Sequence, residues 1–478
     1  MGVVGGGTNR LDHQLQRLLG GKRVAGTLFE LGNSYQNGGA IGVIQGFCSL
    51  RGAIGARHGI IRHNVALGRG GVRDDLVGAA CPRPAFRNGR NRFALKRATT
   101  RVAAMRLGKT KEEFAPMLKH FLVPEEDQVR VSEQAARAGT QAVFEAMGVP
   151  EADAALCTDV LITSDLRGCE SHGISNTLRQ YVAGYRAERM NPVPNVKTVR
   201  ESAVSATLDA DTAIGLQVGP KAMEIAMEKA EEFGMGAVGV QNCGHVGMLA
   251  YYPLMAIERD MIGVCMVSAG GHLMVPTFGS ETVFGTHPIA WAAPADEMPP
   301  FVFDVATTQV AANKIMLTRR IGSKLEPGWI TDLEGNPIMD RVDAPDYGKF
   351  FMPPFGGTRE NGSHKGMGFA TVADIMSGIL SGNGPGFMAG GGKLSQFVMA
   401  FRIDAFTDLA KFKEDMDALL RRIADMKPAS GHERVYYAGL IEHEEAASRR
   451  ELGIPYHREV VEWFNGASAE LNLNLRWP

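Results

Sequence analysis

Two glycine-flanked histidines are the residues of this sequence whose surroundings best fit catalysis. One lies in Asp165-Leu-Arg-Gly-Cys-Glu-Ser-His172-Gly and the other in Gln241-Asn-Cys-Gly-His245-Val-Gly. Glycine permits tight turns and a close approach of the backbone, so each ring is placed where it could reach a ligand. Because imidazole gains and loses a proton near neutral pH, the pair predicts proton chemistry.

His245 follows an expected strand and precedes a helical pattern. A neutral imidazole in that place could take a proton from a hydroxyl and return it in the reverse direction, as a dehydrogenase requires. A capping or core histidine is the alternative interpretation for both His245 and His172. The neighbouring Ser171 and Arg167 favour a polar pocket around His172.

Two further charged residues occupy positions that suit ligand binding. Lys365 lies at the expected N-terminus of a helix, where a positive charge and free backbone N–H groups favour a phosphate or carboxylate; the alternative is a surface lysine. Asp304 ends an apolar strand and needs a partner, such as a histidine, a lysine or ribose hydroxyls. It could equally cap the next helix.

The triplet Gly234, Gly236 and Gly239 matches the dinucleotide-binding pattern G-x-G-x-x-G. That pattern binds a pyrophosphate only when a strand precedes it and a helix follows. Here an expected helix leads in and a strand leads out. We therefore interpret these glycines as a helix stop and a tight entry to the strand.

The spacing of apolar residues predicts a mixed α/β fold, with helical N-terminal and C-terminal parts around a central mixed sheet. The helix after Lys365 is apolar on nearly every side, so we expect it to be buried. Helices are expected at residues 125–148, 150–160, 174–185, 220–233, 246–259 with a kink at Pro253, 310–318, 365–380, 407–425 and 442–465. Strands are expected at residues 203–209, 237–241, 261–267, 283–292, 301–305 and 435–438. Residues 105–200, 201–390 and 391–478 form the expected divisions of the fold.

Residues 1–104 differ in composition from the rest of the chain. Up to residue 105 there are 16 Lys and Arg against 4 Asp and Glu, although the whole chain has a formal charge of −1. This glycine- and arginine-rich piece has no amphipathic stretch, so we expect coil, translated from an early start upstream of a functional chain that begins near Met105. A nucleic-acid-binding tail and a mitochondrial transit peptide are the alternatives.

The remaining composition is that of an ordinary globular protein, with 45% hydrophobic residues. There is no run of eighteen apolar residues and no secretion signal, so neither membrane insertion nor export is indicated. The six cysteines have no disulfide-framework spacing, which favours reduced thiols in the cytoplasm. We expect no nucleic-acid partner.

The motifs in combination resemble the type 2 malate/L-lactate dehydrogenase family, which includes ureidoglycolate and sulfolactate dehydrogenases and a cyclic imino acid reductase. The resemblance spans residues 125–463. It is carried by Asp165-Leu-Arg-Gly with Ser171-His-Gly, Asn242 to His245 with Tyr251-Tyr252, Gly285-Thr-His-Pro-Ile, Phe303-Asp-Val-Ala-Thr-Thr and His364-Lys-Gly. It implies an NAD- or NADP-dependent oxidoreductase and a homodimer. Residues 105–200 would belong to a substrate domain and residues 201–390 to a non-Rossmann cofactor domain, with residues 391–478 returning to the first domain.

The resemblance also implies roles for individual residues. His245 would accept or donate the proton, with Ser171 and His172 beside the substrate. The residues that would line the nicotinamide cofactor are Ser268, Asp304, Val305, Ala306 and Lys365. The family often has an arginine where this chain has Asn176, so we expect Arg179, or Arg167 as a neighbouring cation, to hold the substrate carboxylate. His287 replaces a usual asparagine and the loop of residues 357–363 is longer than is typical, and both departures bear on cofactor or substrate choice.

We therefore expect an enzyme that interconverts a small 2-hydroxy acid, such as malate or lactate, and its 2-oxo acid. Within the same family, reduction of a cyclic imino acid is the alternative. From another class, Cys169, His172, Cys243 and His245 could form a Cys2His2 zinc site, either hydrolytic or structural.

Overall fold

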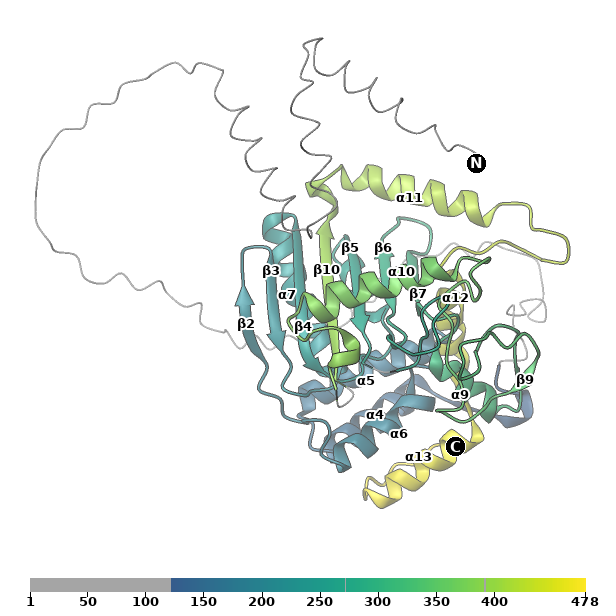
Figure 1. The fold of residues 1–478 in the computed structure, drawn as a ribbon. Coiled ribbons are helices and arrows are strands. Elements are labelled where there is room, and N and C mark those ends of the chain that lie inside the picture. The colour runs from purple at the N-terminus through teal and green to yellow at the C-terminus, as the bar shows by residue number, and fades with distance from the viewer. Residues whose placement is uncertain (1–121, 271, 391–392) are drawn as a thin grey trace, which may run out of the picture. The chain divides into compact units, whose positions relative to one another are not determined.

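The computed structural model describes residues 122–270, 272–390 and 393–478, and the expectations for residues 1–104 lie outside this part. A seven-stranded sheet forms its centre (Figure 1). In spatial order the strands are β2 (Lys197–Glu201), β3 (Ser205–Asp209), β4 (Met235–Cys243), β10 (Leu394–Arg402), β5 (Met261–Ser268), β6 (Ile289–Ala293) and β7 (Phe301–Val305). Strands β3 and β4 are parallel, and all other neighbours in this sheet pair antiparallel. The predicted mixed α/β class with a non-Rossmann centre is confirmed, because a Rossmann sheet is mostly parallel.

The interpretation of the glycine triplet is also confirmed. Helix α7 (Gly215–Phe233) ends at Gly234, which has a left-handed φ of 87°, and β4 begins at the next residue. A positive φ suits glycine because it has no Cβ to clash with the backbone. The order is therefore helix, glycine, strand, as the sequence indicated.

Helices cover both faces of the sheet. Helices α7 and α8 (Tyr251–Ile257) pack on one face, and α10 (Ser363–Ala373) with the π-helical segment η5 (Asp374–Ile379) packs on the other. The prediction that the helix after Lys365 is buried is wrong. Its small residues face the sheet, whereas Phe369, Val372 and Ile375 are 53%, 44% and 47% exposed. Uniform apolarity in the sequence did not reveal which side of this helix lies against the strands.

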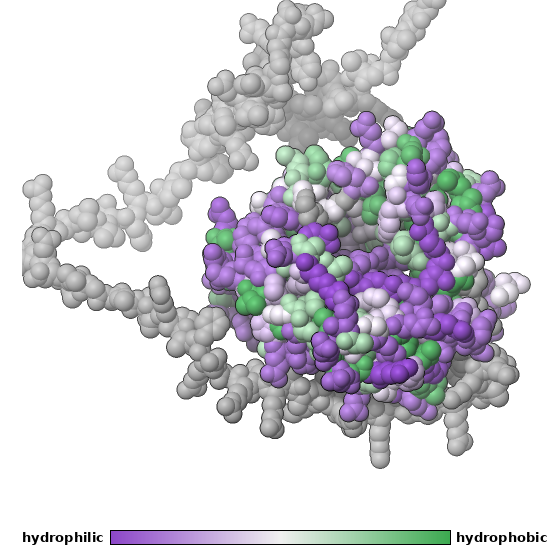
Figure 2. Space-filling model, turned by 90° about the horizontal axis from the view of Figure 1, so that it is seen from below, coloured by the Kyte–Doolittle hydropathy of each residue, from purple (hydrophilic) through white to green (hydrophobic). Residues whose placement is uncertain are grey.

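The N-terminal helices pack below the sheet in Figure 1 and join the end of the chain. They are α4 (Glu133–Ala146), α5 (Glu151–Leu166) and α6 (Ile174–Arg186). A two-stranded sheet of β1 (Gln128–Val131) and β11 (Ile454–His457) links them to α12 (Leu440–Leu452) and α13 (Arg458–Glu470). The face on the side of α6 and α13 is mainly hydrophilic, with scattered small hydrophobic groups (Figure 2). None of the described helices is long and apolar enough to cross a membrane.

Several element boundaries differ from the predictions. The helix expected from residue 125 begins at Glu133, because Gln128–Val131 pairs with β11 and Ser132 caps α4 by accepting a hydrogen bond from the backbone N–H of Ala135. Helix α8 begins only at Tyr251, so Pro253 lies in its first turn and no kink is needed. Residues 435–438 are not a strand, and strand β10 falls after residue 390 yet lies in the middle of the central sheet.

The remaining elements surround this framework, and of these the start of α9 contributes Ala312 and Asn313 to the cavity described below. They are η4 (Glu125–Asp127), α9 (Ala312–Arg320), β8 (Lys324–Leu325), β9 (Val342–Asp343), η6 (Gly386–Met388), η7 (Ile403–Ala405) and α11 (Leu409–Ala424). The main hydrophobic core joins the central sheet, α7 and the N-terminal helices in one cluster. The turns that carry both histidines therefore connect elements of a single core.

Candidate active site

A cavity of about 880 Å³ brings together residues from distant parts of the chain. The turn before α6 contributes Ser171 and His172, and the turn after β4 contributes His245. The end of β7 contributes Asp304 and Ala306. The segment that leads into α12 closes another part of the wall. With Arg167, six of the residues predicted from the sequence thus line one space.

The two predicted histidines lie side by side in this cavity. Their ring centroids are 5.8 Å apart and the ring planes differ by 13°. Ser171 Oγ lies 2.8 Å from Nδ1 of His172. This contact occupies Nδ1 and leaves Nε2 of His172 available to a ligand.

Tyr181 is a site residue that the sequence analysis missed. Its hydroxyl lies 2.6 Å from Nδ1 of His245, and the backbone nitrogen of Gly247 lies 3.3 Å from the same atom. Tyr181 falls within the helix expected at residues 174–185, and its ring is buried. The one available signal was that a buried tyrosine usually needs a hydrogen-bond partner for its hydroxyl.

The surroundings keep both imidazoles neutral. Burial lowers the pKa of His172 to about 4. Burial, together with the charge that His172 carries when protonated, lowers the pKa of His245 to about 3. Both rings are open to the cavity but enclosed by protein elsewhere, so a proton on either one is poorly solvated. At neutral pH His245 is therefore a base without a proton on one ring nitrogen.

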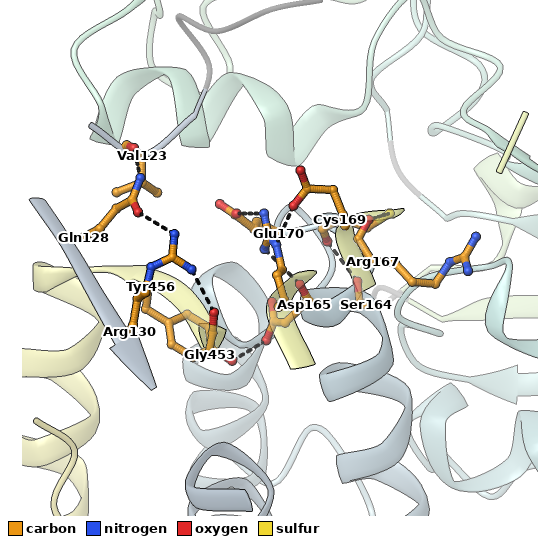
Figure 3. A network of polar contacts seen from close by, with 12 residues as sticks. Val123, Gln128, Arg130, Ser164, Asp165, Arg167, Cys169, Glu170, Gly453 and Tyr456 are labelled. Carbon is orange, nitrogen blue, oxygen red and sulfur yellow. Dashed lines mark hydrogen bonds and ion pairs between the residues drawn. The ribbon is translucent and has the colours of Figure 1, made fainter. Parts of the chain in front are cut away.

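Arg167 is a buried cation in the same cavity. Its side chain extends away from the polar network around Asp165 (Figure 3) and lines the cavity wall. Arg167 is only 9% exposed, and no hydrogen-bond partner for its Nη2 exists among the residues that the structure describes. Burial lowers the pKa of Arg167, although nearby acidic groups such as Glu442 and Asp304 oppose this. A buried guanidinium with an unused N–H is suited to an anionic ligand.

Asp304 faces the cavity and also caps a helix. Its Oδ2 accepts a hydrogen bond of 2.7 Å from the backbone N–H of Ala250, directly before α8. The capped helix is therefore α8, which packs on β5 and β6, rather than the next helix in sequence. Burial raises the pKa of Asp304 to about 6 although this N–H favours the ionised form.

Arg179, Ser268, Val305 and Lys365 do not line this cavity. Arg179 forms two hydrogen bonds to Glu459, at 2.8 and 3.1 Å, and its guanidinium lies 5.2 Å from the ring centre of Trp463. Its charge is thus already paired, so this cavity gives no support to the expectation that Arg179 holds the substrate carboxylate.

The cofactor-lining role expected for three of these residues also finds no support in their positions. Ser268 is buried and donates a 2.5 Å hydrogen bond to Asp374. Lys365 is exposed near the start of α10, and Val305 follows Asp304 on β7 outside the cavity wall.

The zinc interpretation is not supported by the positions of the cysteines. The Sγ of Cys169 donates to the Arg167 carbonyl at 3.9 Å, and that of Cys243 donates to the Leu394 carbonyl at 3.4 Å. Within the described ranges, no group of three or more His, Cys, Asp and Glu side chains gathers around a possible metal position. The four cysteines described there are unpaired thiols.

The sequence comparison agrees with this arrangement. Residues 131–465 match the protein family described as malate/L-lactate dehydrogenase. The chain belongs to this family. The predictions of family, fold class and dehydrogenase activity are therefore confirmed.

Individual members of the malate/L-lactate dehydrogenase family are similar over most of their length. The chain is 35% identical to malate dehydrogenase of Pyrococcus horikoshii over 346 residues, which cover 71% of this chain and 95% of that protein. It is 32% identical to L-sulfolactate dehydrogenase of Methanocaldococcus jannaschii over 339 residues, covering 70% and 94%. The solved structure of the Pyrococcus horikoshii enzyme superposes with a TM-score of 0.68 at 31% identity, covering 75% of this chain and 99% of that one.

Proposed function

We propose that this family member interconverts a small 2-hydroxy acid, of the malate or lactate type, and its 2-oxo acid with NAD or NADP. The observation that carries the proposal is the pair of neutral imidazoles in one cavity, with His245 held by Tyr181. An alcohol gives up a proton when it is oxidised, and a neutral histidine within reach of the hydroxyl accepts it.

The cavity suits a nicotinamide nucleotide together with a small acid. Its volume of about 880 Å³ falls within the roughly 300–1,000 Å³ of pockets that bind cofactors. Asp304 and Ala306 are the predicted cofactor-binding residues that line it, and a carboxylate there could accept hydrogen bonds from ribose hydroxyls. When bound, the nicotinamide ring supplies the hydride acceptor or donor.

His245 is assigned the proton transfer. Its Nδ1 faces the Tyr181 hydroxyl, which leaves Nε2 for the substrate hydroxyl. For Nε2 to accept the substrate proton, Nδ1 of the neutral ring carries the hydrogen and donates it to the Tyr181 oxygen, a hydrogen bond that strengthens as the imidazolium forms. His172, with Ser171 on its own Nδ1, would donate to or accept from the same substrate.

We assign the binding of the substrate carboxylate to Arg167 instead of Arg179. The two arginines differ in what already surrounds them: Arg179 is paired with Glu459, whereas Arg167 lines the cavity and has an unused N–H. A carboxylate that binds Arg167 would neutralise a buried charge and gain charge-assisted hydrogen bonds. This choice follows from burial and pairing, which a sequence motif alone does not display.

The enzyme is proposed to work as a homodimer. Large apolar side chains project from the outer side of α10 and η5, while Ala370, Ala373 and Gly378 face the sheet. The outer set is Phe369, Val372, Ile375 and Ile379, all 44–53% exposed. An apolar stripe on the outside of a helix is typical of a surface that another chain covers. A cytoplasmic location is proposed as well, supported by the unpaired thiols.

One assay tests the proposed reaction. Oxidation of NADH and NADPH is followed by absorbance with a panel of 2-oxo acids and cyclic imines, for the parent enzyme and for His245→Ala. The variant is expected to lose about 10²–10⁴-fold in kcat while its cofactor dissociation constant, measured by fluorescence, stays nearly unchanged. Turnover by His245→Ala within a few-fold of the parent enzyme would overturn the assignment.

A further inference from the structure

Asp165 has no part in the proposed chemistry, yet it is one of the most constrained residues of the chain. It is fully buried in the last turn of α5, seven positions before His172. Its Oδ2 accepts hydrogen bonds from the backbone N–H of Ile174, at 3.0 Å, and from the hydroxyl of Tyr456, at 2.8 Å. One carboxylate oxygen therefore ties the start of α6 and strand β11 to the end of α5.

Arg449 of α12 reinforces the same connection. Its Nη1 donates to the Asp165 carbonyl at 2.9 Å, and its Nη2 lies 3.0 Å from Oε1 of Glu170, two residues before His172. Arg449 and Glu170 are 4% and 8% exposed, so water competes little for these contacts. Figure 3 shows Asp165 between Tyr456 and the turn that carries Cys169 and Glu170.

The turn has almost no room to move against this carboxylate. A Cβ on Gly173 would lie 1.7 Å from Oδ1 of Asp165, so the side chain is packed directly on the backbone next to His172. The same turn is also held from α9, where Asn313 donates to the Ser171 carbonyl at 2.8 Å. Any displacement of Asp165 must therefore move the backbone that carries His172.

We propose that Asp165, held by Tyr456 and Arg449, is a positioning residue that fixes the Ser171–His172 turn in the cavity. The C-terminal segment thereby completes a site whose catalytic histidines lie far earlier in the chain. The inference rests on the proposed function for its catalytic consequence. Its structural part, that Tyr456 and Arg449 set the environment of the His172 ring, holds independently of the substrate.

Tyr456→Phe is the first test, because it removes one hydroxyl and keeps the ring. That ring stacks on Trp477 with centroids 5.3 Å apart, so packing is retained. The matched control is Tyr251→Phe, which removes a 2.7 Å hydrogen bond between another tyrosine and the carboxylate of Asp159, outside the cavity wall. A fall in kcat of about tenfold is expected for Tyr456→Phe, with cofactor affinity unchanged, and little change in kcat is expected for Tyr251→Phe.

The second readout does not depend on turnover. The NMR signal of the His172 ring, assigned by comparison with His172→Gln, is expected to shift in Tyr456→Phe and to stay in place in Tyr251→Phe. An unshifted His172 signal in a folded Tyr456→Phe protein would overturn the proposal. If the parent enzyme reduces none of the acids tested, the proposed function fails, and the His172 signal still decides the positioning role.

Arg449 supplies a further pair of variants should Tyr456→Phe fail to fold. Arg449→Met removes the donors to Asp165 and Glu170, whereas Arg449→Lys keeps a cation that can bind one of them. We expect kcat to fall from the parent enzyme to Arg449→Lys and further to Arg449→Met. The displacement of the His172 signal is expected to increase in the same sequence. Equal kcat and an unshifted His172 signal in both variants would contradict the positioning role.

Discussion

Removal of the Tyr181 hydroxyl is the most direct test of how His245 is activated. Tyr181→Phe deletes the 2.6 Å contact to Nδ1 but keeps the buried ring, which also packs near Phe144 with centroids 6.2 Å apart. A hydrogen bond to a charged group contributes about 1.5–3 kcal/mol. Because the imidazole becomes charged only as the proton is transferred, this loss falls on the transition state. We expect kcat/KM to fall about 10- to 150-fold.

Steady-state kinetics and thermal unfolding of two phenylalanine variants separate this effect from a loss of stability. Tyr185→Phe is the matched control: it lies one turn later on α6, is also buried, and loses a 3.2 Å hydrogen bond to Gln217 rather than one to His245. Its kcat/KM is expected to stay near that of the parent enzyme. If Tyr181→Phe is no more impaired than Tyr185→Phe, the contact with Nδ1 contributes nothing to catalysis and the reasoning is refuted.

Three other perturbations follow from the same site and surfaces. Arg167→Gln should raise KM for the 2-oxo acid about 10- to 100-fold and leave KM for the nucleotide unchanged; equal increases in both would contradict a carboxylate role. Asp165→Asn tests burial: burial and the nearby Glu170 raise the pKa of Asp165 to about 7, although Ile174 N–H, Tyr456 and Arg449 oppose them. The folded state then holds more protons than the unfolded state, so Asp165 stabilises the fold at low pH and this stabilisation is lost as the pH rises to about 7. Between acidic and alkaline pH, the free energy of unfolding should therefore fall by on the order of 4 kcal/mol more in the parent protein than in Asp165→Asn. Urea unfolding at both pH values measures this difference, and the same pH dependence in both proteins would exclude a perturbed carboxyl. Val372→Glu with Ile375→Glu should convert a dimer into monomers in light-scattering chromatography, and a parent protein that is itself monomeric would refute the proposed interface.

Features set by neighbouring residues could be predicted from the sequence. The turns around His172 and His245, and the helix stop at Gly234, depend on glycine and on periodicity over a few residues, and the structure contains all three. Strand β1 could not be predicted in this way, because residues 128–131 become a strand only by pairing with residues 454–457. Local patterns carry no information about a partner so distant in the chain.

The same limit applies to the residues of the site. Arg179 fits a substrate-binding role by its position near a motif, but it forms an ion pair with Glu459, 280 residues later in the chain. Tyr181 looks like a core residue until the fold brings His245 to its hydroxyl. Both outcomes depend on side chains that meet only in three dimensions, so motif spacing names the candidates and the fold selects among them.

The position of β10 has a consequence for how this protein is made. Strands β4 and β5 both pair with β10, which the ribosome adds more than 120 residues after β5 ends. Until then each of the two strands has one unpaired edge, and β1 stays unpaired until β11 has been synthesised. Open strand edges promote association between chains. A nascent chain halted before residue 394 would therefore carry a divided sheet, and we expect it to need a chaperone where the finished protein does not.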